Sequence, residues 1–298
     1  MGQIARIILL SGTIISCTAP VIEFIQDFDD LVAGTVLTDN QVRDAFSMES
    51  KFYVKNDGTP GVMIVADPAN SGRDKVFQVS WPKGSVKTTG GGAQWVTRIT
   101  AGDEYYFSYD IYVPAGFNWP LSSKLPGLYG GDLGTVTGGK KGDGVHGFAL
   151  RQGVVSERKE GDTGGYFYIG DGVLMATPNT YESTGVARYN YALVNKFDGD
   201  SARLVPGKWM TLQQRVKLNT ATSKASVGYK ANGIYEAWVD GVKVFSDRGL
   251  GYRIVDSLKI DGISFVWFYG GNGGDFAARE DQAYYFDNFV LSTQPISH

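Results

Sequence analysis

Apolar and polar residues alternate with a period of two along much of this chain, and that spacing restricts the folds open to it. In the segment 104–113 one face is apolar, comprising Tyr105, Phe107, Tyr109, Ile111 and Val113. Residues 210–219 repeat the pattern, with Gln214 as a polar exception on the apolar face. Side chains of a β-strand point alternately to its two faces, so both segments are expected to be strands with one buried face.

Turn signals favour the same interpretation. Asp240-Gly241 separates two strand-like runs, 235–239 and 242–245, and this dipeptide suits the positive φ angles of a type I′ hairpin turn. Further strands are expected at 263–269 and 284–291, and only residues 41–50 suggest a helix.

Composition agrees with an all-β fold. The 298 residues include 40 glycines and 13% aromatic residues but only 20% charged residues, which suits many short strands joined by tight turns. No repeat, low-complexity linker or block of charge marks a domain boundary. We therefore expect residues 19–298 to form one antiparallel β-sandwich of the jelly-roll type, with a concave substrate groove on one sheet.

The N-terminus has the features of an export signal. Arg6 precedes an apolar run, residues 7–15, that is too short to span a membrane and is typical of a secretory signal peptide. We expect residues 1–18 to be removed and the protein to be secreted. The stretch Ile14-Ile15-Ser16-Cys17 also resembles a bacterial lipoprotein signal, in which Cys17 would carry a lipid anchor. No other segment is expected to cross a bilayer.

Charge and cysteine content exclude several classes of function. With 28 basic and 31 acidic residues the net charge is -3, so no global basic field exists to hold a nucleic acid or an anionic membrane, and a polyanion would need a local basic patch. Cys17 is the only cysteine, which excludes an internal disulfide and a cysteine-based zinc cluster. No metal-binding motif stands out. We expect a monomer without a cofactor.

Residues 127–144 are rich in glycine and are expected to form a loop that shapes the wall of a cleft. A phosphate-binding loop would need a following helix, and neither that helix nor a GxxxxGK[ST] motif is present. Lys140 and Lys141 in this segment could bind a polyanion, although solvated loop lysines are the commoner case.

Two strand-like segments bring polar groups to one face. In residues 148–152 the alternation places Ala149 and Arg151 on one face and Phe148 and Leu150 on the other. In residues 166–169 it places Tyr166 and Tyr168 on one face, with Cα atoms roughly 7 Å apart. If these segments pair, Arg151 and both phenols share a surface, although exposed tyrosines on a strand are commonly structural.

A family resemblance covers roughly residues 100–292. Lys124-Leu125-Pro126-Gly127-Leu128-Tyr129-Gly130-Gly131, which follows the segment 109–117, resembles the signature of the family 14 polysaccharide lyases, the alginate and glucuronan lyases. Arg151 and the Tyr166-Phe167-Tyr168 segment follow in the family's order, and the segments 206–209, 238–241 and 285–289 are also similar.

The resemblance implies a β-jelly roll that binds an acidic polysaccharide in a groove on one sheet. It also implies catalytic roles for Lys124, Arg151, Tyr166 and Tyr168. A serine usually stands two positions before the arginine, and this chain has Ala149 there. That departure puts one substrate hydrogen bond in doubt, together with the choice among uronates.

The chemistry of such a lyase explains these residue types. Elimination removes the proton on C5 of a uronate and expels the oxygen on C4, which requires the neighbouring carboxylate to be neutralised. A lysine and an arginine would stabilise the enolate-like state. A phenol has a reference pKa near 10 and can act as base or acid once adjacent cations lower that pKa. The two tyrosines would take these roles in either order, with Lys124 as a rival base.

Other residues and other functions stay open on the sequence alone. Arg98, Gln94 and Gln152 are candidates for outer sugar subsites, and His146 is a further candidate that by alternation points away from Arg151. The alternatives to a lyase are a non-catalytic carbohydrate-binding module and a glycoside hydrolase. The hydrolase would need two carboxylates facing one groove.

Overall fold

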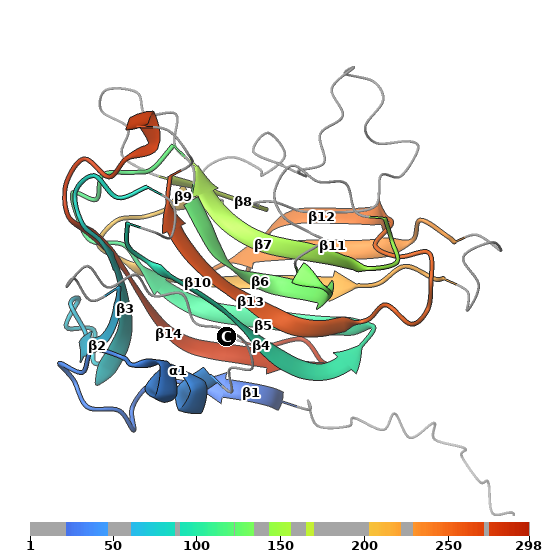
Figure 1. Ribbon diagram of the computed structural model, residues 1–298, viewed down its shortest axis with the longest axis horizontal. Coiled ribbons are helices and arrows are strands. Elements are labelled where there is room, and N and C mark those ends of the chain that lie inside the picture. The colour runs from blue at the N-terminus through green and yellow to red at the C-terminus, as the bar shows by residue number, and fades with distance from the viewer. Residues whose placement is uncertain are drawn as a thin grey trace, which may run out of the picture.

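The protein is an antiparallel β-sandwich, as the alternation predicts (Figure 1). The computed structural model describes residues 22–46, 61–86, 90–121, 123–133, 143–155, 165–169, 203–221, 229–270 and 274–297. Every strand pair within these ranges is antiparallel. Within the same ranges no helix is long and apolar enough to cross a membrane.

One sheet has eight strands in the order β12-β11-β10-β5-β14-β3-β2, with β1 paired to β14. Its strands are β1 (Ile22–Gln26), β2 (Val62–Ala66), β3 (Lys75–Trp81), β5 (Glu104–Tyr112), β10 (Trp209–Lys217), β11 (Gly233–Val239), β12 (Val242–Leu250) and β14 (Gln282–Ser292). The predicted strands at 104–113, 210–219 and 284–291 therefore belong to this sheet.

The other sheet has six strands in the order β4-β13-β6-β7-β8-β9. Its strands are β4 (Ala93–Gly102), β6 (Ser123–Gly131), β7 (Gly147–Val155), β8 (Gly165–Ile169), β9 (Arg203–Leu204) and β13 (Ile260–Tyr269). The predicted pairing of the segments 148–152 and 166–169 is confirmed, because β7 and β8 are neighbours in this sheet.

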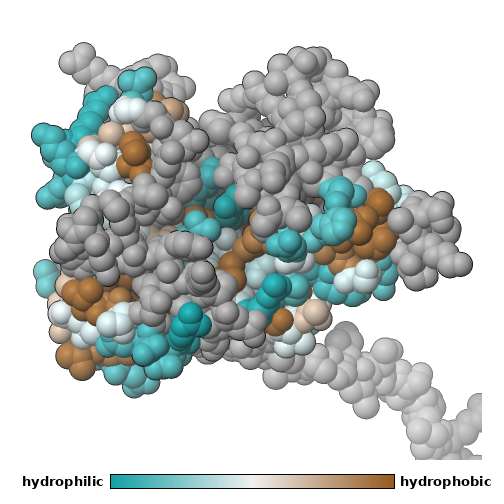
Figure 2. Space-filling model, in the orientation of Figure 1, coloured by the Kyte–Doolittle hydropathy of each residue, from teal (hydrophilic) through white to brown (hydrophobic). Residues whose placement is uncertain are grey.

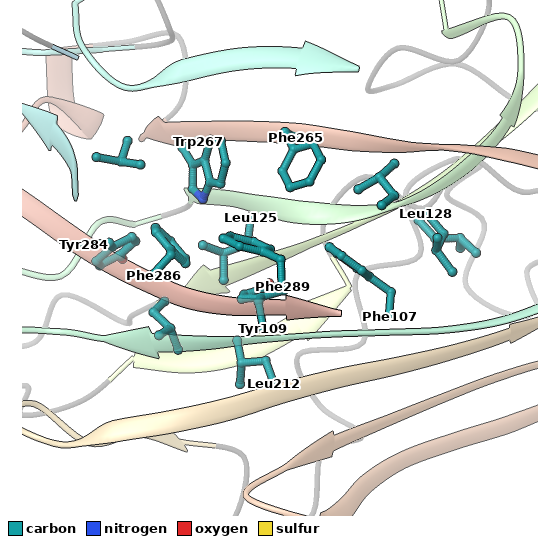
Figure 3. Close-up of a cluster of buried hydrophobic side chains, with 14 of the residues drawn as sticks. Phe107, Tyr109, Leu125, Leu128, Leu212, Phe265, Trp267, Tyr284, Phe286 and Phe289 are labelled. Carbon is teal, nitrogen blue, oxygen red and sulfur yellow. The ribbon is translucent and has the colours of Figure 1, made fainter. Parts of the chain in front are cut away.

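The core lies between the two sheets and is rich in aromatic rings (Figure 3). The inward face of β5 supplies Tyr105, Phe107, Tyr109 and Ile111, which are at most 2% exposed, as the alternation predicts. Phe265 and Trp267 of β13 meet Phe286 and Phe289 from β14, with ring centroids of Trp267 and Phe286 5.4 Å apart. Burial of these rings fixes which face of each sheet points outward.

The hairpin and the helix also form where the sequence places them. Asp240 and Gly241 both have positive φ angles, 47° and 75°, and join Val239 to Val242 as a type I′ turn requires. Helix α1 (Asp39–Phe46) begins two residues before the predicted helix at 41–50, and residues 47–60 lie outside the described ranges. Thr38 and Gln41 bond reciprocally at its start, with the Gln41 side chain accepting from the Thr38 N–H at 3.0 Å.

A short 3₁₀ turn, Gly274–Phe276, precedes β14.

Candidate active site on the six-stranded sheet

The outer face of the six-stranded sheet collects the polar positions that the sequence singles out. Phe148 and Leu150 of β7 are fully buried in the core, so their neighbour Arg151 belongs to the outer face and is half-buried there. Figure 2 looks onto this side of the molecule, where hydrophilic and hydrophobic residues lie next to one another.

Residues 127–131 belong to strand β6 together with Lys124, which corrects the expectation that residues 127–144 form a loop. β6 lies in the middle of the sheet between β13 and β7. The register with β7 shifts between Leu125 and Gly127, so Pro126 occupies a bulge where its missing N–H costs no ladder hydrogen bond. Residues 134–142, the rest of the glycine-rich segment, lie outside the described residues.

Glycines in β6 are there because neighbouring backbone is too close for a side chain. A Cβ atom at Gly127 would lie 2.1 Å from the Leu150 carbonyl oxygen, and one at Gly130 would lie 2.1 Å from the Lys259 carbonyl oxygen. The glycines of this motif therefore allow neighbouring strands to pack closely, and they do not form a turn.

Lys124 lies on the outer face next to β7. The pairs Leu125–Gln152 and Gly127–Arg151 fix the register, and Ser123 extends it by exchanging two 3.1 Å hydrogen bonds with the backbone of Val154. Lys124 therefore stands beside Gly153, with its side chain only 6% exposed. Little water reaches this ammonium group, so a carboxylate beside it would be bound more strongly than in bulk solvent.

The tyrosine positions of β8 adjoin the same place. Tyr168 pairs with Gly153 and Tyr166 pairs with Val155. Both tyrosine positions therefore face the same side of the sheet as Arg151 and Lys124. By strand spacing the Cα atoms of Arg151 and Tyr168 are each roughly 8–10 Å from that of Lys124. The side chains of β8 lie outside the described part of the chain. Gly153, which is buried and has no side chain, thus lies between the strand that carries Lys124 and the strand that carries the two tyrosines.

Comparison with protein families shows which family the chain belongs to. The family model described as "Polysaccharide lyase 14" matches residues 69–289, about three quarters of the chain. The chain belongs to polysaccharide lyase family 14. The resemblance stated from Lys124 to Gly131 is thereby confirmed.

Solved structures of alginate lyases share the fold. This chain is 18% identical to alginate lyase Aly36B, with a TM-score of 0.70, covering 93% of this chain and 98% of that one. It is 20% identical to the marine PL-14 alginate lyase from Aplysia kurodai, with a TM-score of 0.67 and coverage of 92% and 100%. For alginate lyase vAL-1 from Chlorella virus the identity is 17%, the TM-score 0.63 and the coverage 86% and 98%. No curated protein matches the chain.

Arg98 and Gln94 of β4 lie on the same outer face as the candidate lyase residues. Gly262 of β13 pairs with both Arg98 and Tyr129, and a Cβ atom there would meet the Tyr129 ring at 2.3 Å. The Tyr129 ring therefore crosses Gly262 and reaches the Arg98 guanidinium, 5.5 Å from the ring centroid. Arg98 Nη1 also donates to Asp261 Oδ2 at 2.8 Å.

Gln94 is half-buried on this strand and pairs with Val266. Both β4 residues remain in positions compatible with outer sugar subsites.

Ala149 is buried on the same side, packed against Tyr129. Ala149, which stands where the family usually has a serine, is therefore buried beside Tyr129 in this chain.

Gln152 does not belong to the groove, and its assignment to an outer subsite is wrong. Its side chain is fully buried between the sheets, where its Oε1 accepts a hydrogen bond from the Tyr109 hydroxyl at 2.7 Å. The reason is strand parity: Gln152 follows the outward Arg151 and so points inward. The same alternation that places Arg151 could have excluded Gln152.

His146 lies just before β7 and is exposed. Its Nδ1 is 2.5 Å from Asp143 Oδ2, and that contact raises the pKa of the imidazole. Slight burial would raise the pKa of Asp143, but hydrogen bonds from His146 lower it to about 2. The contact between Asp143 and His146 holds together the segment that precedes β7. Lys140 and Lys141 lie outside the described residues.

The residues that sequence reasoning missed are mostly small or acidic. Gly127, Gly153 and Ser264 line the outer face beside Arg151, and Asp261 anchors Arg98. Glycines inside strand-like runs were the available signal for close packing of neighbouring strands at this place. Among the described residues no group of three or more histidine, cysteine or acidic side chains is placed to hold a metal ion.

Proposed function

We propose that this protein cleaves a uronic-acid polymer by β-elimination on the outer face of the six-stranded sheet. The observation that carries the proposal is the convergence of Lys124, Arg151 and the backbone position of Tyr168 around Gly153, in a chain of polysaccharide lyase family 14. A buried lysine and a half-buried arginine supply two fixed positive charges beside Gly153, a residue without a side chain. That arrangement suits one sugar carboxylate.

Each of these side chains has a role in the proposed reaction. Lys124 and Arg151 bind the uronate carboxylate and stabilise the negative charge that develops when C5 loses its proton. The base is one of the phenolates of Tyr166 and Tyr168, with Lys124 as the rival base. The C5–H electron pair forms the C4–C5 double bond, the C4–O4 bond breaks, and the second phenol gives its proton to O4. The products are a new non-reducing end with an unsaturated ring and a shortened chain.

Alginate is the substrate we propose first. The similar solved structures are named as alginate lyases, and one of them holds an alginate tetrasaccharide. Glucuronan presents the same C5 carboxylate, so it is the second substrate to test.

A protein acting on such a polymer would meet it outside the cell. We propose export directed by residues 1–18, with lipidation of Cys17 as the alternative. N-terminal sequencing and mass measurement of the protein recovered from its host distinguish cleavage before Cys17 with a lipid from ordinary cleavage nearby.

The decisive experiment incubates the protein with purified polymannuronate, polyguluronate and glucuronan and follows ultraviolet absorbance of the unsaturated product. Absorbance rising with at least one polymer supports the lyase. Reducing ends without absorbance would indicate a hydrolase, and retention of the polymer without either signal would indicate a binding module.

Tyrosine variants then test the roles. Tyr166→Phe and Tyr168→Phe each remove a proton-transfer group, and we expect a loss of activity of about 10²-fold or more in each. Tyr285→Phe, a partly exposed tyrosine on the other sheet, is the matched control. Full activity in both β8 variants contradicts the assigned roles.

A further inference from the structure

A groove lies on the outer face of the eight-stranded sheet, on the opposite side of the sandwich from the candidate active site. Its volume is about 420 Å³, which is within the range of small-ligand pockets. The side chains that define it come from β5, β10, β11 and β12. They are Tyr106, Arg215, Glu236, Trp238, Lys243 and Arg248, and we call this the cationic groove.

One buried carboxylate organises the cations of this groove. The Glu236 side chain is 2% exposed and accepts hydrogen bonds from Arg215 Nη1 at 2.7 Å, Lys243 Nζ at 2.7 Å and Arg248 Nη2 at 2.8 Å. Burial would raise the pKa of Glu236, but the hydrogen bonds from Lys243 and Arg215 lower it to about 2. Glu236 is therefore ionised at neutral pH, and it holds the three basic side chains in fixed positions.

The groove has more positive charge than its carboxylates balance. Arg215 also bonds Glu104 at 2.6 Å, and Lys217 bonds the same carboxylate at 2.8 Å. Four cations meet two carboxylates, which leaves two positive charges on a chain of net charge -3. One basic side chain would be enough to neutralise the charge of the buried Glu236, whereas three basic side chains bond to it. The excess points to an anionic ligand.

The cations that carry the excess are accessible. The Lys243 side chain is 43% exposed and that of Arg248 is 62% exposed, whereas Arg215 is only 18% exposed. Lys243 and Arg248 can thus exchange part of their contact with Glu236 for contact with a ligand carboxylate, while Arg215 keeps Glu236 paired.

An aromatic surface adjoins these charges. The partly exposed indole of Trp238 lies with its ring centroid 5.0 Å from Lys243 Nζ, and the Arg215 guanidinium lies 5.5 Å from the Tyr106 ring centroid. An apolar ring beside an ammonium group matches a pyranose that carries a carboxylate, with its C–H face on the indole and its acid on the cation.

We propose that the cationic groove is a second, non-catalytic binding site for a uronate segment of the acidic polysaccharide. The identity of the ligand rests on the proposed lyase function, whereas the site itself rests on the geometry of Glu236 and its cations. A site on the sheet opposite the active site would retain the polymer while the other face cuts it. A short oligosaccharide can contact only one face of the sandwich, so the cationic groove does not strengthen its binding at the active site.

The test compares two charge-matched double variants. Lys243→Ala/Arg248→Ala removes the accessible cations, with Lys243→Gln/Arg248→Gln as a second form that keeps longer stems. Lys83→Ala/Lys230→Ala removes two exposed lysines that do not line the groove, and so changes the net charge equally. Retention in native gels containing polymannuronate measures binding. Product absorbance measures KM on polymer and kcat/KM on a tetrasaccharide.

We expect the groove variants to bind the polymer about tenfold more weakly and to show a higher KM on polymer, with kcat/KM on the tetrasaccharide unchanged. Groove variants that bind and cut polymer as the control does would overturn the proposal, as would a parallel loss on the tetrasaccharide. A protein that cuts no polyuronate but is retained through Lys243 and Arg248 would refute the lyase function and support the groove.

Discussion

Gly127 of β6 lies directly across from Arg151 of β7, and no side chain fits between the two backbones. A Cβ atom at Gly127 would be 2.7 Å from the Arg151 Cα and 2.1 Å from the Leu150 carbonyl oxygen. The glycine therefore lets the strand that carries Lys124 approach the strand that carries Arg151. Spacing of the two cations depends on a residue that has no polar group of its own.

Replacing Gly127 by alanine should separate β6 from β7 and displace Arg151. We expect the free energy of unfolding to fall by about 1–3 kcal/mol because the added methyl group overpacks the site. We also expect kcat/KM on polyuronate to fall by about tenfold to a hundredfold, since small misplacements of binding groups are costly in catalysis. Urea unfolding and product absorbance measure the two effects.

Gly274→Ala is the control for that variant. Gly274 has no atom within 4 Å of its added Cβ and no positive φ angle, so stability and activity should stay near those of the unchanged protein. Equal behaviour of the two alanine variants would show that close approach at Gly127 is unimportant.

Period-two alternation was sufficient to predict the strands at 104–113, 148–152 and 210–219 and their buried faces. Tyr105, Phe107, Tyr109 and Ile111 are buried as expected, and Arg151 faces outward because Phe148 and Leu150 face the core. These outcomes follow from hydrophobic burial acting on a backbone whose side chains alternate. Family resemblance was needed to single out Lys124.

The register in which strands distant in the chain pair could not be predicted from the sequence. Gly127 looked like a turn residue because glycine permits positive φ angles, but here it serves close strand packing. Neither the pairing of Gly153 with Tyr168 nor the position of Tyr129 over Gly262 has a local signal. Gln152 is different, since the alternation already pointed it inward.

Removing the charge of Lys124 should lower the catalytic efficiency much more than the stability of the fold. Lys124→Met keeps an unbranched side chain in a site that is 6% exposed, but it cannot stabilise the developing negative charge. We expect kcat/KM to fall about 10²–10³-fold, as when one oxyanion donor is lost. Lys83→Met, at an exposed lysine in the turn after β3, should have little effect. A loss of less than threefold for Lys124→Met argues against the assigned role.

Arg98 and Asp261 should have opposite effects on substrate binding. Asp261 accepts from Arg98 Nη1 at 2.8 Å and from the Gly131 N–H at 2.9 Å, so it competes with a substrate carboxylate for the arginine. Asp261→Asn keeps an oxygen acceptor for Gly131 and removes the competing charge. We expect KM on polymer to fall about threefold in Asp261→Asn and to rise about threefold in Arg98→Ala, with kcat unchanged. Steady-state kinetics check both, and shifts in the same direction contradict an outer subsite at Arg98.

The stability contributed by Glu236 should disappear in acid. Its folded-state pKa of about 2 is below the ordinary value of 4.5, so folding favours the ionised form. This contribution is complete above pH 4.5 and is lost as the pH falls toward 2. Glu236→Gln should therefore be less stable than the unchanged protein by about 1–2 kcal/mol at pH 6, because three cations lose their shared carboxylate.

The difference in urea midpoint between the two proteins should narrow at pH 3. Glu280→Gln, at an exposed glutamate, removes the same charge and should show a small difference at both pH values. A gap for Glu236→Gln that is the same at pH 6 and pH 3 would mean that the Glu236 charge does not hold the cationic groove together.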